Sequence, residues 1–146
     1  MKKTNLIFLI LLLNISVFIS AQDVNVTEDF QKPSKEDFFH SWFSEYITGK
    51  SKYFFEITYL NESSYIFTTS FLFTKTKQNY VISKWEEASN IFDYVEEYPY
   101  GFKIYAKESN NRSEMIFYIF INNEKTKYLS VNNFGDYRQY YIYTKK

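Results

Sequence analysis

A chain of 146 residues with 17 basic and 17 acidic side chains has no net charge, and it contains no cysteine. The absence of cysteine excludes disulfides, thiolate metal sites and lipid attachment to a cysteine. Basic and acidic residues are interspersed, so the sequence offers no basic stripe for nucleic acid and no polybasic anchor for lipid. The composition is unusual in one respect, because 23% of the residues are aromatic.

The N-terminal segment has the pattern of a secretion signal. Lys2 and Lys3 precede an unbroken apolar run over 6–13, and Ile19-Ser-Ala21 forms a small-residue end. Even the wider stretch 6–19 has only 14 residues, fewer than the roughly 20 of a membrane-spanning helix. We therefore predict a signal peptide over 1–21 cleaved after Ala21, a secreted or periplasmic location and no stable membrane insertion.

Export of a chain without cysteine favours a bacterial envelope over a eukaryotic secretory route. Against this, three segments match the glycan acceptor pattern, Asn25-Val-Thr27, Asn61-Glu-Ser63 and Asn111-Arg-Ser113. Removing 21 residues from 146 leaves 125, the size of one domain with enough interior to fold without disulfides. We predict a polar tether over 22–33 and a single domain over 34–146.

One amphipathic helix is predicted at the start of this domain, over about Lys35 to Thr48. Ser34 and Asp37 have the spacing of a capping box, and Gly49 is typical of a helix end. The apolar residues between them recur at spacings that fill one side of a helix: Phe38, Phe39, Trp42, Phe43, Tyr46 and Ile47. Such a wide aromatic stripe must be buried, and the expected partner is a sheet.

After Gly49 the apolar period changes to two, which predicts β-strands. Eight are expected, near 52–60, 65–76, 79–86, 91–98, 101–109, 113–122, 125–132 and 137–144. Turn signals lie near Glu62, Gln78, Ser89, Tyr100, Asn111, Asn123 and Gly135. The fold class is therefore mainly β, an antiparallel up-and-down meander with the helix packed on it. Both a barrel and a strongly curved sheet remain open, and the barrel is favoured.

The clearest hairpin joins Met115–Ile121 to residues 126–131 through the turn 122–125. Its first strand is apolar on both alternating faces, so we expect it to be covered on both sides or to line a closed barrel. An eight-strand meander resembles the lipocalin-like group in architecture. The Gly-x-Trp that opens the first strand of that family is missing here, and a helix is predicted before strand one, so no family is assigned.

The sequence gives no sign of catalysis, and we expect a non-enzyme without metal or cofactor. His40 is the only histidine and has no serine elbow or metal partner, so it is interpreted as structural. The neighbouring carboxylates in Glu86-Glu87 and in Glu96-Glu97 point to opposite faces of a strand, which excludes each pair as a catalytic dyad. They are interpreted as solvated charges.

Tyrosines near strand ends are the candidate binding residues, because such rings can stack on sugars or anchor a protein interface. The chosen set is Trp85, Tyr94, Tyr98, Tyr100 and Tyr140. We expect a non-catalytic binding domain that holds a small apolar or aromatic ligand in the barrel mouth, or docks a glycan or an envelope protein through this tyrosine-rich face. The alternative is an inhibitor or immunity-type protein whose loops block an enzyme. A ligand carrier should contain a cavity, and an inhibitor should have a filled interior.

Overall fold

The computed structural model describes residues 31–146. The predicted signal peptide and most of the predicted tether lie outside the described residues. Within them, no helix is both long enough and apolar enough to cross a lipid bilayer.

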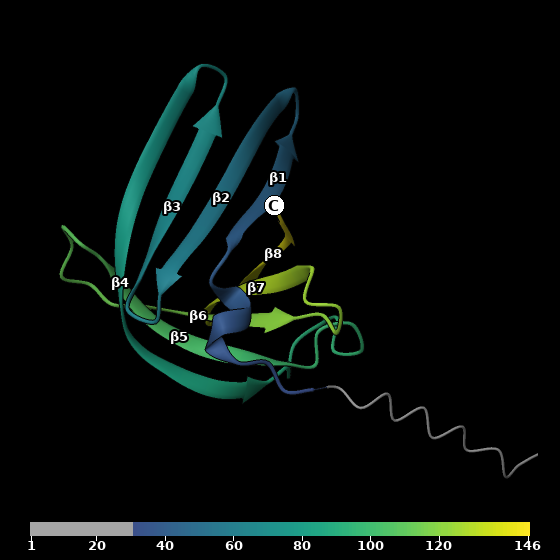
Figure 1. Ribbon diagram of the computed structural model, residues 1–146. Helices are drawn as coiled ribbons and strands as arrows, with labels where there is room; N and C mark the ends of the chain where they lie inside the picture. Colours follow the sequence, from purple (N-terminus) through teal and green to yellow (C-terminus); the bar gives the residue numbers. More distant parts are fainter. Residues whose placement is uncertain (1–30) are drawn as a thin grey trace, which may run out of the picture.

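Eight antiparallel strands follow one another in an up-and-down meander, and β1 also pairs with β8, so the sheet closes into a barrel (Figure 1). The barrel interpretation of the meander is thereby confirmed over the curved sheet. The strands are β1 (Ser41–Thr48), β2 (Ser51–Asn61), β3 (Ser64–Phe71), β4 (Thr74–Ser89), β5 (Tyr100–Glu108), β6 (Met115–Ile121), β7 (Lys127–Phe134) and β8 (Tyr137–Lys145).

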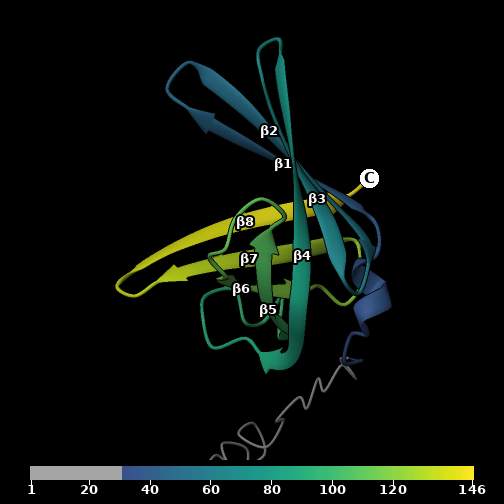
Figure 2. The ribbon, with the colours of Figure 1, turned by 90° about the vertical axis from the view of Figure 1, so that its left-hand side faces the viewer.

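The barrel is closed along only part of its length. The seam between β1 and β8 consists of two residue pairs, Trp42 with Lys145 and Phe43 with Thr144. Beyond the seam, the β1–β2 and β3–β4 hairpins rise away from the β7–β8 hairpin, as both views show (Figures 1 and 2). One end of the barrel is therefore closed and the other is open.

Strand β4 belongs to both parts of the barrel because it is long and bent. Its first half pairs with β3, and its second half pairs with β5. The register against β5 shifts between Ile82 and Lys84, which is the position of a β-bulge. A bulge increases local twist and turns the strand, so one 16-residue strand can follow the raised hairpin and then the barrel wall.

The predicted helix over Lys35 to Thr48 is wrong. Only a 3-10 turn, η1 (Lys35–Phe38), forms there, and strand β1 begins at Ser41. The apolar residues come in adjacent pairs, a pattern that fits a helix stripe and also a strand with two apolar faces. Aromatic and β-branched residues favour the strand, and pairing with β2 along the full length of β1 decides between the two.

Gly49 has a different role from the predicted helix end. Its φ is +57°, and it occupies the first position of the two-residue turn between the paired residues Thr48 and Ser51. Glycine is favoured at that position of a hairpin turn because it adopts positive φ without steric cost.

The predicted strand over 91–98 is a loop. The side chain of Asn90 organises it, since its amide donates to the carbonyl oxygens of Asp93 and Tyr98 and its oxygen accepts from the backbone N–H of Phe92. These bonds replace those of a strand ladder. The turn predicted near Gln78 lies instead at residues 72 and 73, between the paired residues Phe71 and Thr74.

From Phe117 to Ile121 both apolar faces of β6 are covered, as the sequence predicts for a barrel strand, whereas Met115 and Ile116 at its start are exposed. Ile119 and Ile121 point into the barrel and belong to its main core. Phe120 points outward and packs in a second cluster with Phe92, Tyr98, Leu129 and Val131. The loop over 90–99 therefore covers the outer face of β6 and β7.

Candidate functional site

The closed end of the barrel is filled by aromatic rings around the plug residue Phe38. Its side chain is fully buried. The centroid of its ring lies 5.9 to 6.4 Å from those of five other rings, which belong to Trp42, Tyr59, Trp85, Phe102 and Tyr128. Edge and tilted contacts of this kind are favourable beyond the area that they bury. Among the described residues, these rings pack the inside of the barrel at this end.

Polar contacts hold the η1 turn in place under the barrel. The indole N–H of Trp42 donates to the carbonyl oxygen of Phe38 over 2.9 Å. The carboxylate of Asp37 lies 2.8 Å from the ammonium of Lys125, in the turn between β6 and β7. Burial opposes ionisation of Asp37, but the hydrogen bonds from Lys125 and from the backbone N–H of Ser34 outweigh it, and the pKa of Asp37 is lowered.

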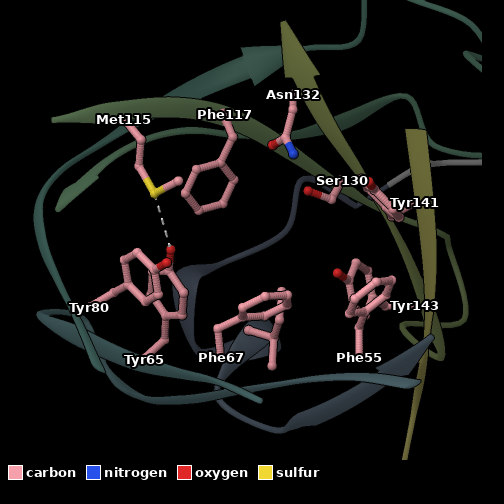
Figure 3. Close-up of a pocket in the computed structure, with 11 residues that line it drawn as sticks. Phe55, Tyr65, Phe67, Tyr80, Met115, Phe117, Ser130, Asn132, Tyr141 and Tyr143 are labelled. Carbon is pink, nitrogen blue, oxygen red and sulfur yellow. Dashed lines mark hydrogen bonds between the residues drawn. The ribbon is translucent and has the colours of Figure 1, made fainter. Parts of the chain in front are cut away.

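Above this packed end the barrel contains a cup with a volume of about 300 Å³. Six strands contribute its lining, and the side chains converge on one space (Figure 3). The lining residues are Phe55, Ile57, Tyr65, Phe67, Tyr80, Met115, Phe117, Ser130, Asn132, Tyr141 and Tyr143. Because the strands diverge beyond the short β1–β8 seam, the inward side chains there cannot meet across the barrel, and this divergence leaves the cup.

Flat aromatic faces form most of the cup wall. The rings of Tyr65 and Tyr80 are stacked with centroids 4.7 Å apart, and those of Phe55 and Phe67 are stacked at 5.8 Å. Tyr141 meets Phe55 edge to face at 5.9 Å. Such a wall favours an apolar or aromatic guest, which it can contact by stacking and by edge contacts.

A few polar atoms interrupt this wall. The hydroxyl of Tyr65 donates to the sulfur of Met115 over 3.8 Å (Figure 3). Ser130 and Asn132 present a hydroxyl and an amide on the β7 wall, and neither side chain forms a hydrogen bond with another described residue. These two groups are available to a ligand.

Among the described residues that line the cup, none has a carboxylate, an ammonium or a guanidinium group. Burial raises the pKa of Tyr65 and the pKa of Tyr143 well above the ordinary tyrosine value. Both phenols therefore remain neutral at physiological pH. The cup provides hydrogen bonds without charge, so an uncharged guest suits it best.

An aromatic ladder continues from the cup along the inner faces of the raised hairpins. The rings of Tyr53 and Phe71 are stacked at 4.4 Å near the hairpin tips. The ring centroid of Tyr46 lies 6.5 Å from that of Tyr53 and 6.4 Å from that of Phe55, a residue of the cup wall. These rings connect the open end of the barrel to the cup by an apolar surface.

The structure separates the five residues that sequence analysis selected for binding. Trp85 lies in the closed end, where its indole N–H donates to the carbonyl oxygen of Glu62 over 2.7 Å. Tyr98 belongs to the loop over 90–99 and is buried against β6 and β7, and Tyr100 is half-buried at the start of β5. Only Tyr94 and Tyr140 meet, with ring centroids 6.1 Å apart on the outer face.

The cup residues were missed because sequence analysis treated the inward-facing rings as core. One signal was available in β7. The residues of β7 that face inward are Tyr128, Ser130 and Asn132. Two of these three side chains are polar, whereas a filled core would have apolar side chains at these positions. Polar residues at inward positions near the end of a barrel strand indicate a solvated or ligand-binding space.

The groups considered for catalysis lie apart from the cup. The carboxylate of Glu86, on the outer surface, is bonded to Lys84 and to the hydroxyl of Tyr105, and these bonds lower its pKa. Burial lowers the pKa of His40, followed by the positive charge of Lys145. In the described part of the chain, no three His, Cys, Asp or Glu side chains gather into a metal site.

The barrel therefore contains an aromatic cup that is closed below by the plug residue Phe38 and open above. Comparisons of this chain with models of protein families, with curated proteins and with solved structures find no match.

Proposed function

We propose that this chain is an exported, non-catalytic binding protein that holds a small, uncharged apolar or aromatic molecule in the barrel cup. The observation that carries this proposal is the cup itself, about 300 Å³ in volume, with a wall of aromatic rings and no charged side chain among its described residues. Ligand pockets begin at roughly this size and have this mixture of apolar wall and few polar groups.

Ser130 and Asn132 give the expected ligand one further property. A ligand that covers these side chains takes their polar atoms away from water, which is costly unless the ligand supplies a hydrogen bond. A ligand that accepts or donates one there therefore gains affinity over a pure hydrocarbon. The best candidates are therefore flat or branched apolar molecules with one hydroxyl, carbonyl or amide group. Charged molecules should bind weakly, because the cup offers no opposite charge to offset their desolvation.

The test uses N-phenyl-1-naphthylamine, a neutral aromatic dye that fluoresces in apolar surroundings. Asn132→Phe puts a ring into the cup, and Asn133→Phe puts the same ring on the exposed outer face of the same strand. We expect the wild type and Asn133→Phe to bind the dye with the same Kd within about twofold. Asn132→Phe should raise the Kd at least about tenfold because the ring blocks the cup, and tenfold corresponds to roughly 1.4 kcal/mol of binding free energy.

Native mass spectrometry of the freshly purified protein separates this function from the inhibitor alternative. A ligand carrier should retain a noncovalent small molecule or take up the dye with one-to-one stoichiometry. A wild-type protein that is empty and binds no dye would contradict the proposed function and would favour an inhibitor that acts through its loops.

A further inference from the structure

The two hairpins at the open end of the barrel finish in exposed apolar tips. Ile47 on β1 is 64% exposed, Leu72 is 78% exposed and Phe73 is fully exposed. The two tips are adjacent, because β2 pairs with β3 and the Tyr53 and Phe71 rings stack between them. Both hairpins project beyond the rest of the molecule (Figures 1 and 2).

The fold does not require apolar residues at the β3–β4 turn. Residues 72 and 73 form a two-residue turn, where glycine and asparagine are the usual choices. Leu72 instead has a φ of +49°, which is strained for a side chain of this type. Leu72 and Phe73 also bury almost nothing, so neither packing nor turn geometry accounts for them.

Lysines surround these tips. Lys50, Lys52, Lys75 and Lys77 lie on the two hairpins. The acidic residues of the β1–β2 hairpin are Glu45, whose carboxylate lies 2.7 Å from the ammonium of Lys52, and Glu56, whose carboxylate lies 3.3 Å from the ammonium of Lys146. The sequence from 63 to 85 contains no Asp or Glu. Among the described residues, Lys50, Lys75 and Lys77 form no salt bridge. A chain without net charge thus concentrates positive charge at its apolar tips.

We propose that the paired tips dock onto the surface of an anionic phospholipid bilayer, with Ile47, Leu72 and Phe73 entering the interface and the lysines contacting lipid phosphates. Apolar and aromatic side chains backed by lysines are the combination that such an interface binds. The long lysine stems can lie against the apolar layer while their ammonium groups stay at the headgroups.

A protein partner fits this surface less well. A stable protein interface buries roughly 800 Å² on each side around a continuous apolar centre. The two adjacent tips are narrow instead, and they suit a soft bilayer better than a rigid complementary surface. Docking does not require an occupied cup, so the two proposals can fail independently.

The test is flotation with large unilamellar vesicles, using protein purified after export so that the predicted signal peptide has been removed. Vesicles of phosphatidylcholine alone are compared with vesicles containing phosphatidylglycerol. The tip variant combines Leu72→Gly with Phe73→Ser. It gives the turn a Gly-Ser sequence that favours positive φ at residue 72, so the variant is expected to fold at least as well as the wild type.

The matched control is Ile91→Ser. Ile91 is 79% exposed, as much as Leu72, but it lies in the loop that follows the opposite end of β4. We expect the wild type and Ile91→Ser to float with anionic vesicles. The partition coefficient of the tip variant onto these vesicles should fall at least about tenfold. Replacing Lys75 and Lys77 with glutamine should weaken binding to anionic vesicles and reduce its dependence on salt, because two of the four lysines remain.

A local probe shows whether the tip itself enters the membrane. A Phe73→Trp variant should shift its emission to the blue on anionic vesicles and be quenched by lipids brominated on their acyl chains. The proposal is overturned if the wild type does not float, if it floats equally with neutral vesicles, or if the tip variant binds as well as the wild type. The proposal is also overturned if the protein does not bind vesicles but binds another protein through the tips.

Discussion

Phe38 closes one end of the barrel, and replacing it with alanine tests how that end is held. The η1 turn is only four residues long and makes few backbone hydrogen bonds to the barrel. Its attachment must therefore come mainly from the buried ring and the groups around it. Phe38→Ala keeps the backbone and removes that ring alone.

The expected loss can be worked out from the burial of the ring. Phe38 is fully buried and contacts five aromatic rings, so the space that its ring leaves is lined by bulky side chains that are themselves packed. Replacing a buried phenylalanine with alanine costs about 3 to 5 kcal/mol when the cavity cannot collapse. Since domains of this size are stable by about 5 to 15 kcal/mol, the variant should lose a large share of its free energy of unfolding.

The measurement is urea denaturation followed by tryptophan fluorescence, with near-ultraviolet circular dichroism as a second signal. Both tryptophans of the chain, Trp42 and Trp85, contact the Phe38 ring, so the dichroism should weaken even in the folded variant. The control is Phe73→Ala, which removes a fully exposed ring and should change stability by no more than about 0.5 kcal/mol. A loss below about 1 kcal/mol for Phe38→Ala would refute the role of Phe38 as a plug.

Three further changes test other parts of the barrel by urea denaturation. The buried hydroxyls of Tyr59 and Tyr128 interact with each other but make no hydrogen bond of good geometry among the described residues. Replacing either tyrosine with phenylalanine should therefore leave stability unchanged or raise it by about 1 kcal/mol, and a clear loss would contradict this. Gly101→Ala should lower the free energy of unfolding by at least about 1 to 3 kcal/mol, because a Cβ there would lie 1.8 Å from the carbonyl oxygen of Ile119. Unchanged stability would show that β5 and β6 are further apart. Asp37→Asn should cost up to about 1 kcal/mol at neutral pH. The pKa of Asp37 is lowered in the folded state, so the difference from the wild type should persist above the ordinary aspartate pKa of 3.8 and disappear as the pH falls through the lower folded-state pKa. A difference that persists in stronger acid would contradict the salt bridge.

Local pattern was enough to predict the β-meander but not the assignment of every strand. The β6 strand matches the bounds predicted for the hairpin, Met115–Ile121, because this apolar run favours a strand with two covered faces, and both faces are covered from Phe117 onward. Eight strands were predicted and eight form, but the numbers agree only because one predicted strand is absent and one unpredicted strand is present. Residues 41–48 form a strand in place of the helix, and the predicted strand over 91–98 is a loop.

Both errors arise from interactions that sequence pattern does not contain. Trp42-Phe43 and Tyr46-Ile47 satisfy a helix stripe and a two-faced strand equally, and only the presence of β2 as a pairing partner selects the strand. The segment after Ser89 has strand-like Phe92 and Tyr94, but the side chain of Asn90 bonds its backbone into a loop. Tertiary context outweighs local propensity in both places.

The sequence predicted a space in the barrel mouth but not the residues that line it. A ligand space in the barrel mouth was one of the expectations, but the residues chosen for binding were tyrosines near turns. Selection by position near a turn could not distinguish Tyr98, which is buried against β6 and β7, from Tyr141, which lines the cup. Which inward-facing rings fill the barrel and which leave a space depends on where β1 and β8 separate, and no sequence pattern marks that point.

Met115 offers the most direct test of the cup. The chain has two methionines, Met1 and Met115, and Met1 lies in the predicted signal peptide, so exported protein labelled with ¹³C-methyl methionine should give a single methyl resonance. Met115 lines the cup and its sulfur accepts the hydrogen bond from Tyr65. If an apolar molecule occupies the cup, titration with N-phenyl-1-naphthylamine should shift this resonance with saturation at one equivalent. A resonance that stays fixed while the dye binds would place the ligand elsewhere and contradict the proposed function.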